Sequence, residues 1–359
     1  MVFKEGQTLA DTYEVICAIP HADPAIAPRI RFIRLPFFRR VLWRTLITSP
    51  YILFRCLWLR PAIVHMYVPE FVPFAFVFRL FGAGVIYEVQ ENLFKKMHLK
   101  PFNRGYLLEL AFRKFDALAR RHFYLIFTEH GYLDTYDNLA KPHVVIYNYP
   151  LLPFLEPFRQ PYQPNQAQPI FFYIGWLSFE RAFDTLIDGL ARLKQAYPAF
   201  VLHLFGRQTF GHAELKRLPA YDSVRANLKF YGYRDQREAF RYVAGATAGL
   251  ALLKPVGDYP ESYTTKLFEY MALGLPVITS DFQLYRDVVE RHQCGFCISP
   301  YDAAQLTDKL IYLIGHPNEA RRMGERGRLA VEQVYNWTTE APKLLHFYTL
   351  VLRERKGDR

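Results

Sequence analysis

The chain has 359 residues, of which 51% are hydrophobic and 17% aromatic, and a formal net charge of +11. At roughly 150 residues per domain, this length predicts about two domains, each able to bury a full core. The apolar content excludes a disordered, collagen-like or coiled-coil chain. The positive charge favours an anionic partner such as a nucleotide, a nucleic acid or lipid headgroups.

The N-terminal part alternates short β-branched or aromatic runs with helical patterns. A helix over residues 1–10 leads into a strand over 13–18. The same patterns predict a helix over 104–121 and strands at 63–67, 85–89, 123–127 and 144–147. This alternation is typical of a parallel, doubly wound sheet. Such a domain normally opens with a strand and a glycine-bearing turn, so the first strand is missing here.

The segment 29–60 combines basic and aromatic side chains. No acidic residue lies between Asp23 and Glu70, and within 29–60 eight arginines are interleaved with seven aromatic residues. This pattern favours a segment lying in the interface of an anionic bilayer. The alternative is a helix packed on its own domain with a solvated basic face. We expect no spanning helix, because neither 41–59 nor 71–87 approaches about 18 uncharged residues, and no nucleic-acid partner, because no RNA-binding signature is present.

The four cysteines do not indicate a disulfide framework in a chain of this length. Without a secretory signal, we expect the reducing cytoplasm, with the protein peripheral at the inner face of the cytoplasmic membrane. Cys294 and Cys297 have the spacing of a redox or zinc pair, but no second ligand pair is nearby. Together with Cys17 and Cys56, they are predicted to be small core residues.

Residues 157–169 contain four prolines and four glutamines, which predicts a semi-rigid linker. The alternation then resumes, with strands at 170–174, 200–205, 228–231, 248–253 and 276–279 and helices at 181–196, 235–244, 264–273, 302–315 and 318–334. A last helix is predicted from Thr338 as N-cap, with Pro342 in its first turn. The predicted fold class is α/β, with two Rossmann-like doubly wound domains over 1–156 and 170–336 that face a cleft, followed by the helix over 337–359.

Two carboxylates, Glu261 and Glu269, lie eight residues apart across a helix start near Thr264. If fully helical, this spacing spans about 12 Å, close to the distance from a sugar ring past a pyrophosphate to a ribose. The first-turn amides around 263–265 and the Lys266 cation suit the pyrophosphate. Glu269 then suits the ribose diol and Glu261 the sugar. The alternative is an amphipathic helix that packs its apolar side chains and carries a solvated glutamate.

The stretch 259–279 resembles the E-x7-E element of the large retaining glycosyltransferase family of GT-B fold, family 4. Its Lys266-Leu-Phe-Glu269-Tyr-Met-Ala run is common among polysaccharide-assembly members. The similarity extends over nearly the whole chain. The segment 175–186 matches the donor-phosphate segment, with Arg181 at a lysine position, and 230–233 matches the segment whose backbone receives the nucleobase. Residues 64–70 and 87–92 match two acceptor-side loops, and the family's last helix crosses back to the N-terminal domain.

The resemblance implies a metal-independent transferase that retains configuration. It would move one sugar from a nucleotide-diphosphate sugar to a lipid-linked saccharide. The chain contains no Asp-x-Asp motif, so Arg181, Lys266 and the helix N-terminus would stabilise the departing diphosphate, and no metal or other cofactor is expected. The catalytic candidates are Glu261, Arg181, Lys266 and Gln90. The donor-binding candidates are Gly175, Arg207, Tyr233, Ser262, Tyr263, Thr264, Thr265 and Glu269. The acceptor-side candidates are His65, Glu70, Glu91, Glu129 and His130, the last two because they follow a strand end.

The chain departs from the family pattern at three places. The first strand and its glycine loop are absent, Trp176 replaces an arginine, and Gln90 stands where a histidine is frequent. Gln90 can donate a hydrogen bond but cannot carry a proton at neutral pH. Two alternatives stay open: a GT-B-fold sugar-nucleotide epimerase, and a degenerate transferase that serves as a membrane-associated binding subunit, which these departures support. The retained Glu261 and Glu269 speak against both.

Overall fold

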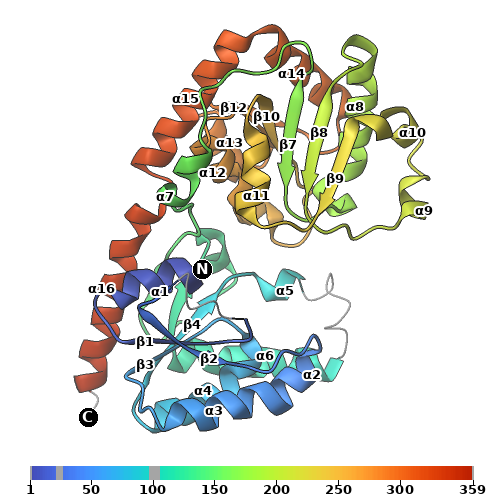
Figure 1. Cartoon of the computed structure of the whole chain (residues 1–359). Helices are drawn as coiled ribbons and strands as arrows, with labels where there is room; N and C mark the ends of the chain where they lie inside the picture. The colour runs from blue at the N-terminus through green and yellow to red at the C-terminus, as the bar shows by residue number, and fades with distance from the viewer. Residues whose placement is uncertain (1, 22–26, 97–105, 358–359) are drawn as a thin grey trace. The chain divides into compact units, whose positions relative to one another are not determined.

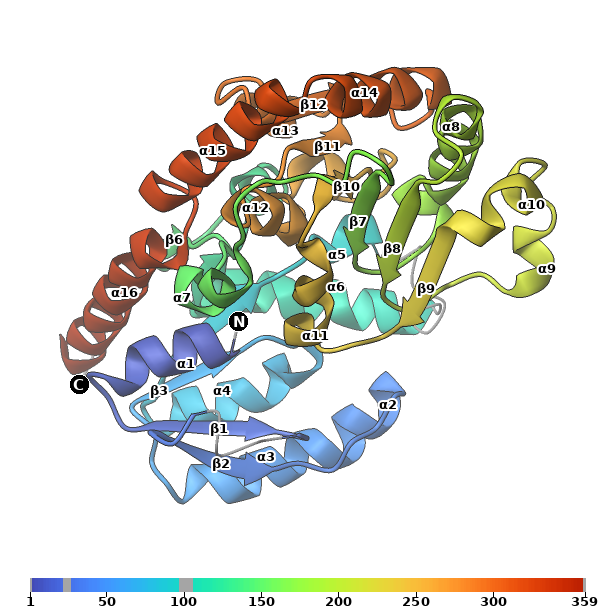
Figure 2. The same cartoon turned by 45° about the horizontal axis from the view of Figure 1, so that its top comes forward.

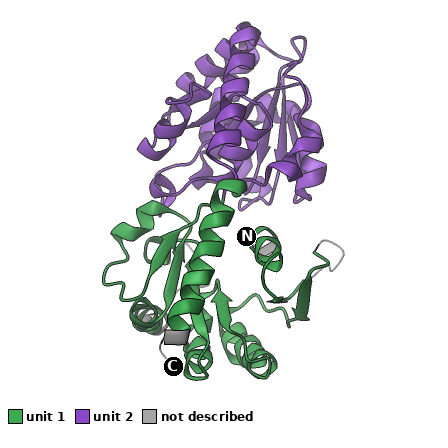
Figure 3. Ribbon diagram, turned by 90° about the vertical axis from the view of Figure 1, so that its left-hand side faces the viewer, with its two compact units in different colours: residues 1–148, 337–359 green, residues 149–336 purple. Residues whose placement is uncertain are grey.

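The computed structural model describes residues 2–21, 27–96 and 106–357 (Figure 1). The chain divides into two compact units, one formed by residues 1–148 together with 337–359 and the other by residues 149–336 (Figure 3). Each unit is built on a parallel sheet, as the alternation of strands and helices predicts.

The first unit contains a four-stranded parallel sheet of order β3-β4-β5-β6 and a separate parallel pair, β1-β2. Its strands are β1 (Val15–Ile19), β2 (Ile30–Arg34), β3 (Ile63–Met66), β4 (Gly84–Val89), β5 (Tyr124–Phe127) and β6 (His143–Val145). Its helices are α1 (Val2–Ala10), α2 (Val41–Trp43), a π-helix (Arg44–Thr48), α3 (Ser49–Leu57), α4 (Val72–Leu80), α5 (Leu93–Lys96), α6 (Tyr106–His122) and α16 (Trp337–Gly357). The predicted elements of this part are confirmed, except that Met1 and residues 104–105 of two predicted helices lie outside the described residues.

The segment 29–60 begins with a strand that the composition did not predict. Ile30 and Ile33 are buried in β2, whereas Arg31 and Arg34 are exposed. The arginines hid the strand, because its buried and exposed positions do not alternate regularly. Only residues 41–57 of the segment are helical, as α2, the π-helix and α3 in succession.

The last helix, α16, packs on the first unit. It begins at Trp337, which makes Asn336 the N-cap, so the predicted N-cap Thr338 is wrong by two residues and lies inside the helix. The Trp337 indole donates to the Thr8 hydroxyl of α1 at 2.9 Å. A Cβ built on Gly84 of β4 would lie 2.6 Å from a methyl of Val351, which shows how closely α16 approaches the sheet.

The second unit is a six-stranded parallel sheet of order β12-β11-β10-β7-β8-β9. Its strands are β7 (Ile170–Ile174), β8 (Val201–Phe205), β9 (Leu228–Gly232), β10 (Ala246–Ala251), β11 (Val277–Ser280) and β12 (Gly295–Ile298). Its helices are α7 (Leu152–Leu155), α8 (Phe183–Ala196), α9 (His212–Leu215), α10 (Tyr221–Val224), α11 (Gln236–Phe240), α12 (Thr265–Ala272), α13 (Gln283–Val289), α14 (Ala303–Gly315) and α15 (Pro317–Gln333). All five predicted strands and five predicted helices of this unit are present, whereas β12 and the short helices α7, α9, α10 and α13 were not predicted.

Helices α8 and α14 lie side by side against one face of this sheet (Figure 2). Gly189 permits the approach, because a Cβ there would lie 2.8 Å from the side chain of Leu306. The Thr307 hydroxyl donates to the Gly189 carbonyl at 2.8 Å and links the two helices.

The proline-rich segment 157–169 packs along the second unit. The ring of Tyr162 lies against the core, and its hydroxyl donates to the Thr247 carbonyl at 2.9 Å. The Asn165 amide donates to the Gly245 carbonyl at 3.1 Å. The segment therefore has fixed contacts with the sheet that it precedes.

The cysteines have the surroundings of packing residues. Cys294 is fully buried, and Cys297 lies in β12. Burial raises the pKa of both thiols to about 12, so neither forms a reactive thiolate readily. Cys17 and Cys56 are partly buried and free. Among the described residues, no helix is both long and apolar enough to cross a membrane.

Gly249 in the middle of β10 provides a test of this packing. A Cβ there would lie 2.3 Å from the ring of Tyr270 in α12. We expect Gly249→Ala to lower the free energy of unfolding by about 1–3 kcal/mol, since the ring has no room to retreat. Gly315→Ala is the matched control, because no atom lies within 4 Å of its Cβ position. Chemical denaturation followed by circular dichroism measures both, and equal stability of the two variants would contradict the packing described.

Candidate functional site

Three neighbouring strands of the second unit end at glycine. Gly175, Gly206 and Gly232 close β7, β8 and β9, and the Gly175 and Gly206 amides donate to the Phe205 and Gly232 carbonyls, each at 2.8 Å. Gly206 has a φ of +143°, and a Cβ there would lie 1.8 Å from the Gly175 carbonyl oxygen. The carboxyl edge of the sheet therefore consists of glycine backbone at the ends of these three strands. Ligands bind at this edge in open parallel sheets.

The residues that follow these glycines stand exposed at the same edge. Trp176 is half exposed and Tyr233 is 73% exposed. The Arg207 guanidinium lies 5.2 Å from the centre of the Tyr233 ring. This places the predicted donor-side residues Arg207 and Tyr233 together.

Two cations flank Gly175. A Cβ built on this glycine would lie 3.1 Å from Lys266 Nζ and 3.3 Å from Arg181 Nη1. Lys266 is 3% exposed, and its Nζ has no hydrogen-bond partner among the residues that the structure describes. The amine instead lies 3.9 Å from the centre of the Tyr173 ring.

The electrostatics of the pair are those of a site for an anion. Burial, reinforced by the Arg181 charge, holds the pKa of Lys266 well below its usual range, and Glu269 opposes this only in part. Burial also acts against the charge of Arg181, but the nearby hydroxyls of Tyr173 and Tyr259 raise its pKa on balance. An anion bound between them would supply the hydrogen bonds and charge that the buried amine lacks.

The two glutamates of the spaced motif are held by different elements. Glu261 ends a 3₁₀ turn over Tyr259–Glu261, whereas Glu269 lies in α12. Thr264 is the N-cap of α12, as predicted, but Ser262 and Thr264 have extended backbone. The chain between the carboxylates is only partly helical, so the 12 Å spacing of a continuous helix does not apply to them.

Tyr285 of α13 fixes this extended stretch. Its hydroxyl donates to the Ser262 carbonyl at 3.1 Å and accepts the Thr264 amide at 3.2 Å. One of the amides expected to face a pyrophosphate is thus already engaged. Tyr263 packs its ring against Phe268, with centroids 5.0 Å apart, whereas Thr265 is exposed at the helix start.

Glu269 is oriented by a residue that sequence reasoning missed. The Gln236 side-chain amide, at the start of α11, donates to Glu269 Oε1 at 3.1 Å. Tyr173, Tyr259 and Tyr285 were missed as well. Gln236 and Tyr285 lie far from the motif in sequence, so no local spacing could have revealed them, and Tyr173 looked like an ordinary residue of a buried strand.

The acceptor-side candidates of the first unit fall into separate environments. Glu70 pairs with Arg44 at 2.8 Å, and Glu91 with Lys96 at 3.6 Å. Glu129 is buried next to the exposed His130. These residues occupy the ends of β3, β4 and β5 or the turns that follow them.

His65 and Gln90 meet at one buried carboxylate, Glu88. His65 Nε2 lies 3.2 Å from Glu88 Oε2, and the Gln90 amide donates to Glu88 Oε1 at 2.9 Å. Burial raises the pKa of Glu88 to about 7, and burial together with the charge of Glu88 does the same for Glu5. Gln90 is thereby oriented by a carboxylate in the interior.

A family model described as "Glycosyl transferases group 1" matches residues 156–330, which make up nearly all of the second unit. This part of the chain is thus similar to group 1 glycosyltransferases. Glycogen synthase of Mycobacterium tuberculosis is 23% identical over 197 residues, covering 55% of this chain and 45% of the relative. Phosphatidyl-myo-inositol mannosyltransferase of Mycobacterium leprae is 26% identical over 188 residues, covering 52% and 48%. The chain thus matches less than half the length of these curated relatives.

Solved structures resemble nearly the whole chain. Sucrose-phosphate synthase of Thermosynechococcus elongatus superposes with a TM-score of 0.74 at 20% identity, covering 98% of this chain and 92% of that one. HepE of Anabaena, solved in complex with UDP-glucose, gives 0.71 at 15% identity, covering 97% and 94%. The fold is GT-B, and the predicted fold class is confirmed.

The buried amine makes a prediction about stability. Lys266→Met removes a buried amine that has no hydrogen-bond partner in the described protein, so we expect the ligand-free variant to be more stable by about 1–3 kcal/mol at neutral pH. The pKa of Lys266 is lower in the folded state than in the unfolded state. At pH values between these two pKa values, the unfolded state binds more protons than the folded state. The stability of the wild type therefore rises with pH over this range. The advantage of Lys266→Met should therefore shrink as the pH is raised.

Denaturation at a series of pH values tests this expectation. Lys216→Met, at an exposed position, is the control and should change stability little at any pH. A Lys266→Met protein less stable than wild type at neutral pH would show that the amine is already compensated.

Proposed function

We propose that the protein is a retaining glycosyltransferase that moves one sugar from a nucleotide-diphosphate sugar to a saccharide acceptor. The observation that carries this proposal is the buried Lys266 amine beside Arg181, at the bare glycine edge of the sheet. The group 1 match and the UDP-glucose complex of the similar HepE structure support a nucleotide sugar as the anion that this site takes.

Charge stabilisation would be the main catalytic contribution of the second unit. Sugar transfer builds an oxocarbenium-like centre while negative charge grows on the departing diphosphate. Lys266 and Arg181 would receive that charge in a poorly solvated place, where electrostatic interactions are strong. In this proposal the two cations perform the task that a metal ion performs elsewhere, and departure of the diphosphate needs no metal.

The two glutamates would bind the ends of the donor. Glu269, held by Gln236, would accept the hydroxyls of the ribose, and Glu261 would orient the sugar through its hydroxyls. Retention would follow from attack on the face that the diphosphate leaves, with a phosphate oxygen taking the acceptor proton. No protein base is then required, which is compatible with Gln90 at a position where relatives often have histidine.

A thermal-shift panel of UDP, GDP, ADP and CMP and their sugars, with and without magnesium, tests the donor site. We expect selective stabilisation that is independent of magnesium, worth about 2.7 kcal/mol at a hundredfold excess over Kd. Glu269→Ala should lose it, whereas Glu290→Ala, a solvent-exposed glutamate of the same unit, should keep it. Stabilisation by none of the nucleotides would overturn the proposal. Binding without turnover, together with a co-purifying transferase, would favour the non-catalytic binding subunit.

We further propose that the acceptor is lipid-linked, as in polysaccharide assembly, and that residues 39–58 lie on the inner face of the cytoplasmic membrane. Phe54 is 70% exposed and Trp58 87% exposed. Other large apolar side chains of this stretch, Leu42, Trp43, Leu46, Ile47 and Tyr51, are also exposed. Exposed Arg39, Arg40 and Arg55 lie among them. A helical segment with apolar side chains in solvent and arginines beside them suits an anionic bilayer surface.

Co-sedimentation with vesicles tests the membrane proposal. The double variant Phe54→Ser, Trp58→Ser should bind anionic vesicles at least about tenfold more weakly, because each side chain contributes on the order of 1.5–3 kcal/mol when buried. The control Leu329→Ser removes an exposed apolar side chain from the other unit and should bind as wild type does. Equal binding of the double variant and wild type would refute the assignment of this surface.

A further inference from the structure

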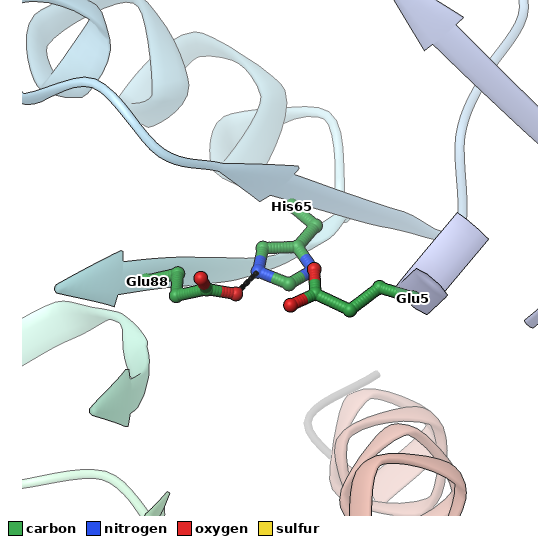
Figure 4. Close-up of side chains that lie close together, drawn as sticks. All are labelled: Glu5, His65 and Glu88. Atoms are coloured by element: carbon green, nitrogen blue, oxygen red, sulfur yellow. Dashed lines mark ion pairs between the residues drawn. The ribbon is translucent and has the colours of Figure 1, made fainter. Parts of the chain in front are cut away.

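A second cluster of ionisable side chains lies in the first unit, within the interior. Glu5 comes from α1, His65 from β3 and Glu88 from β4, and their side chains converge (Figure 4). Glu5 and Glu88 are each 1% exposed, and the side chain of His65 is 8% exposed. Three polar groups from three elements thus meet where water is largely excluded.

The outward-facing atom of each side chain already has a partner. The Tyr67 hydroxyl donates to Glu5 Oε2 at 2.6 Å. The Tyr348 hydroxyl lies 2.8 Å from His65 Nδ1, and Gln90 donates to Glu88 Oε1. Such outer partners fix the orientation of metal ligands in proteins.

The remaining atoms are Glu5 Oε1, His65 Nε2 and Glu88 Oε2. None has a hydrogen-bond partner within the described part of the chain. One ligand atom from each side chain lies within 4.8 Å of the other two, and His65 Nε2 is 3.2 Å from Glu88 Oε2. Two ligands held by one tetrahedral ion through bonds of about 2.1 Å lie about 3.4 Å apart, so this separation is close to that of a shared ion.

We propose that Glu5 Oε1, His65 Nε2 and Glu88 Oε2 bind one divalent transition-metal ion, with zinc as the best match. A neutral imidazole and two carboxylates form a set of nitrogen and oxygen donors that zinc accepts. Magnesium and calcium prefer oxygen ligands alone. The two positive charges of the ion neutralise the two carboxylates, which otherwise face each other in the interior without a cation.

The ion has a structural and a positioning role. It ties α1 to β3 and β4, and through Glu88 it fixes the acceptor for the Gln90 amide. This site is separate from the cations at Gly175 and does not depend on the proposed sugar transfer. Zinc here and metal-independent nucleotide binding in the second unit are compatible.

The experiment uses the full chain, stripped with a chelator and titrated with zinc by calorimetry and by competition with a chromophoric chelator. We expect one high-affinity zinc per chain, and a rise in melting temperature on binding. Glu88→Gln and His65→Gln should each weaken zinc binding at least 100-fold. Tyr348→Phe, which removes an outer partner only, should weaken it by about 10–100-fold. His143→Gln, at an exposed histidine of the same unit, is the control.

The isosteric Glu88→Gln change also guards against misfolding. If the metal-free variant melts at or above the metal-free wild type but no longer responds to zinc, the loss is one of a ligand and not of the fold. Absence of stoichiometric zinc in the wild type would overturn the proposal, as would unchanged zinc affinity in Glu88→Gln. If the wild type does not respond to zinc and the Glu88→Gln variant is more stable than the wild type, the side chains of the cluster share protons instead of a metal ion.

Discussion

The burial of the Lys266 amine is the interaction on which the second unit's site depends. Lysine is placed there by α12, whose Tyr270 lies one turn further along on the same face of the helix. The Tyr270 hydroxyl accepts the Ile174 amide at 3.0 Å and donates to the Leu250 carbonyl at 3.4 Å, so it links α12 to β7 and β10. Gly249 leaves room for the ring. Because Gly249 has no side chain, Tyr270 can pack against the sheet, and α12 then holds the Lys266 amine beside Gly175.

The residues of the motif around Glu261 and Glu269 are held in place by residues that are far from them in the sequence. The helix start at Thr264 and the strand ending at Gly175 could be predicted, because N-caps, helical periodicity and glycine turns leave local signals. The bond from Gln236 to Glu269 joins residues 33 positions apart and leaves no periodic trace. The same holds for Tyr285, which imposes the extended backbone between the two glutamates.

The two strands that the sequence analysis missed, β2 and β12, both lie at the edge of a sheet. The central strands β7 and β10 are buried runs with a strong pattern, whereas β2 carries two exposed arginines and β12 opens with glycine. Their assignment depends on a neighbour to pair with, which is tertiary information. Similarly, the likeness of the loop at Gln90 to acceptor loops gave no hint that Glu88 would be enclosed.

Glu88 is the most constrained residue of the first unit. All six residues of β4 are buried, and an ionised carboxylate in such a strand costs several kcal/mol unless it is compensated. His65 does not compensate it through a hydrogen bond, although the two atoms are only 3.2 Å apart. A proton shared between them would need Nε2–H to point at the oxygen. A metal ion has no such directional requirement. It needs only to lie at bonding distance from His65 Nε2, Glu88 Oε2 and a carboxylate oxygen of Glu5. The arrangement of filled outer atoms and unfilled inner ones therefore suits a cation at the centre, which would serve all three side chains, whereas a proton shared along one edge would serve only two of them.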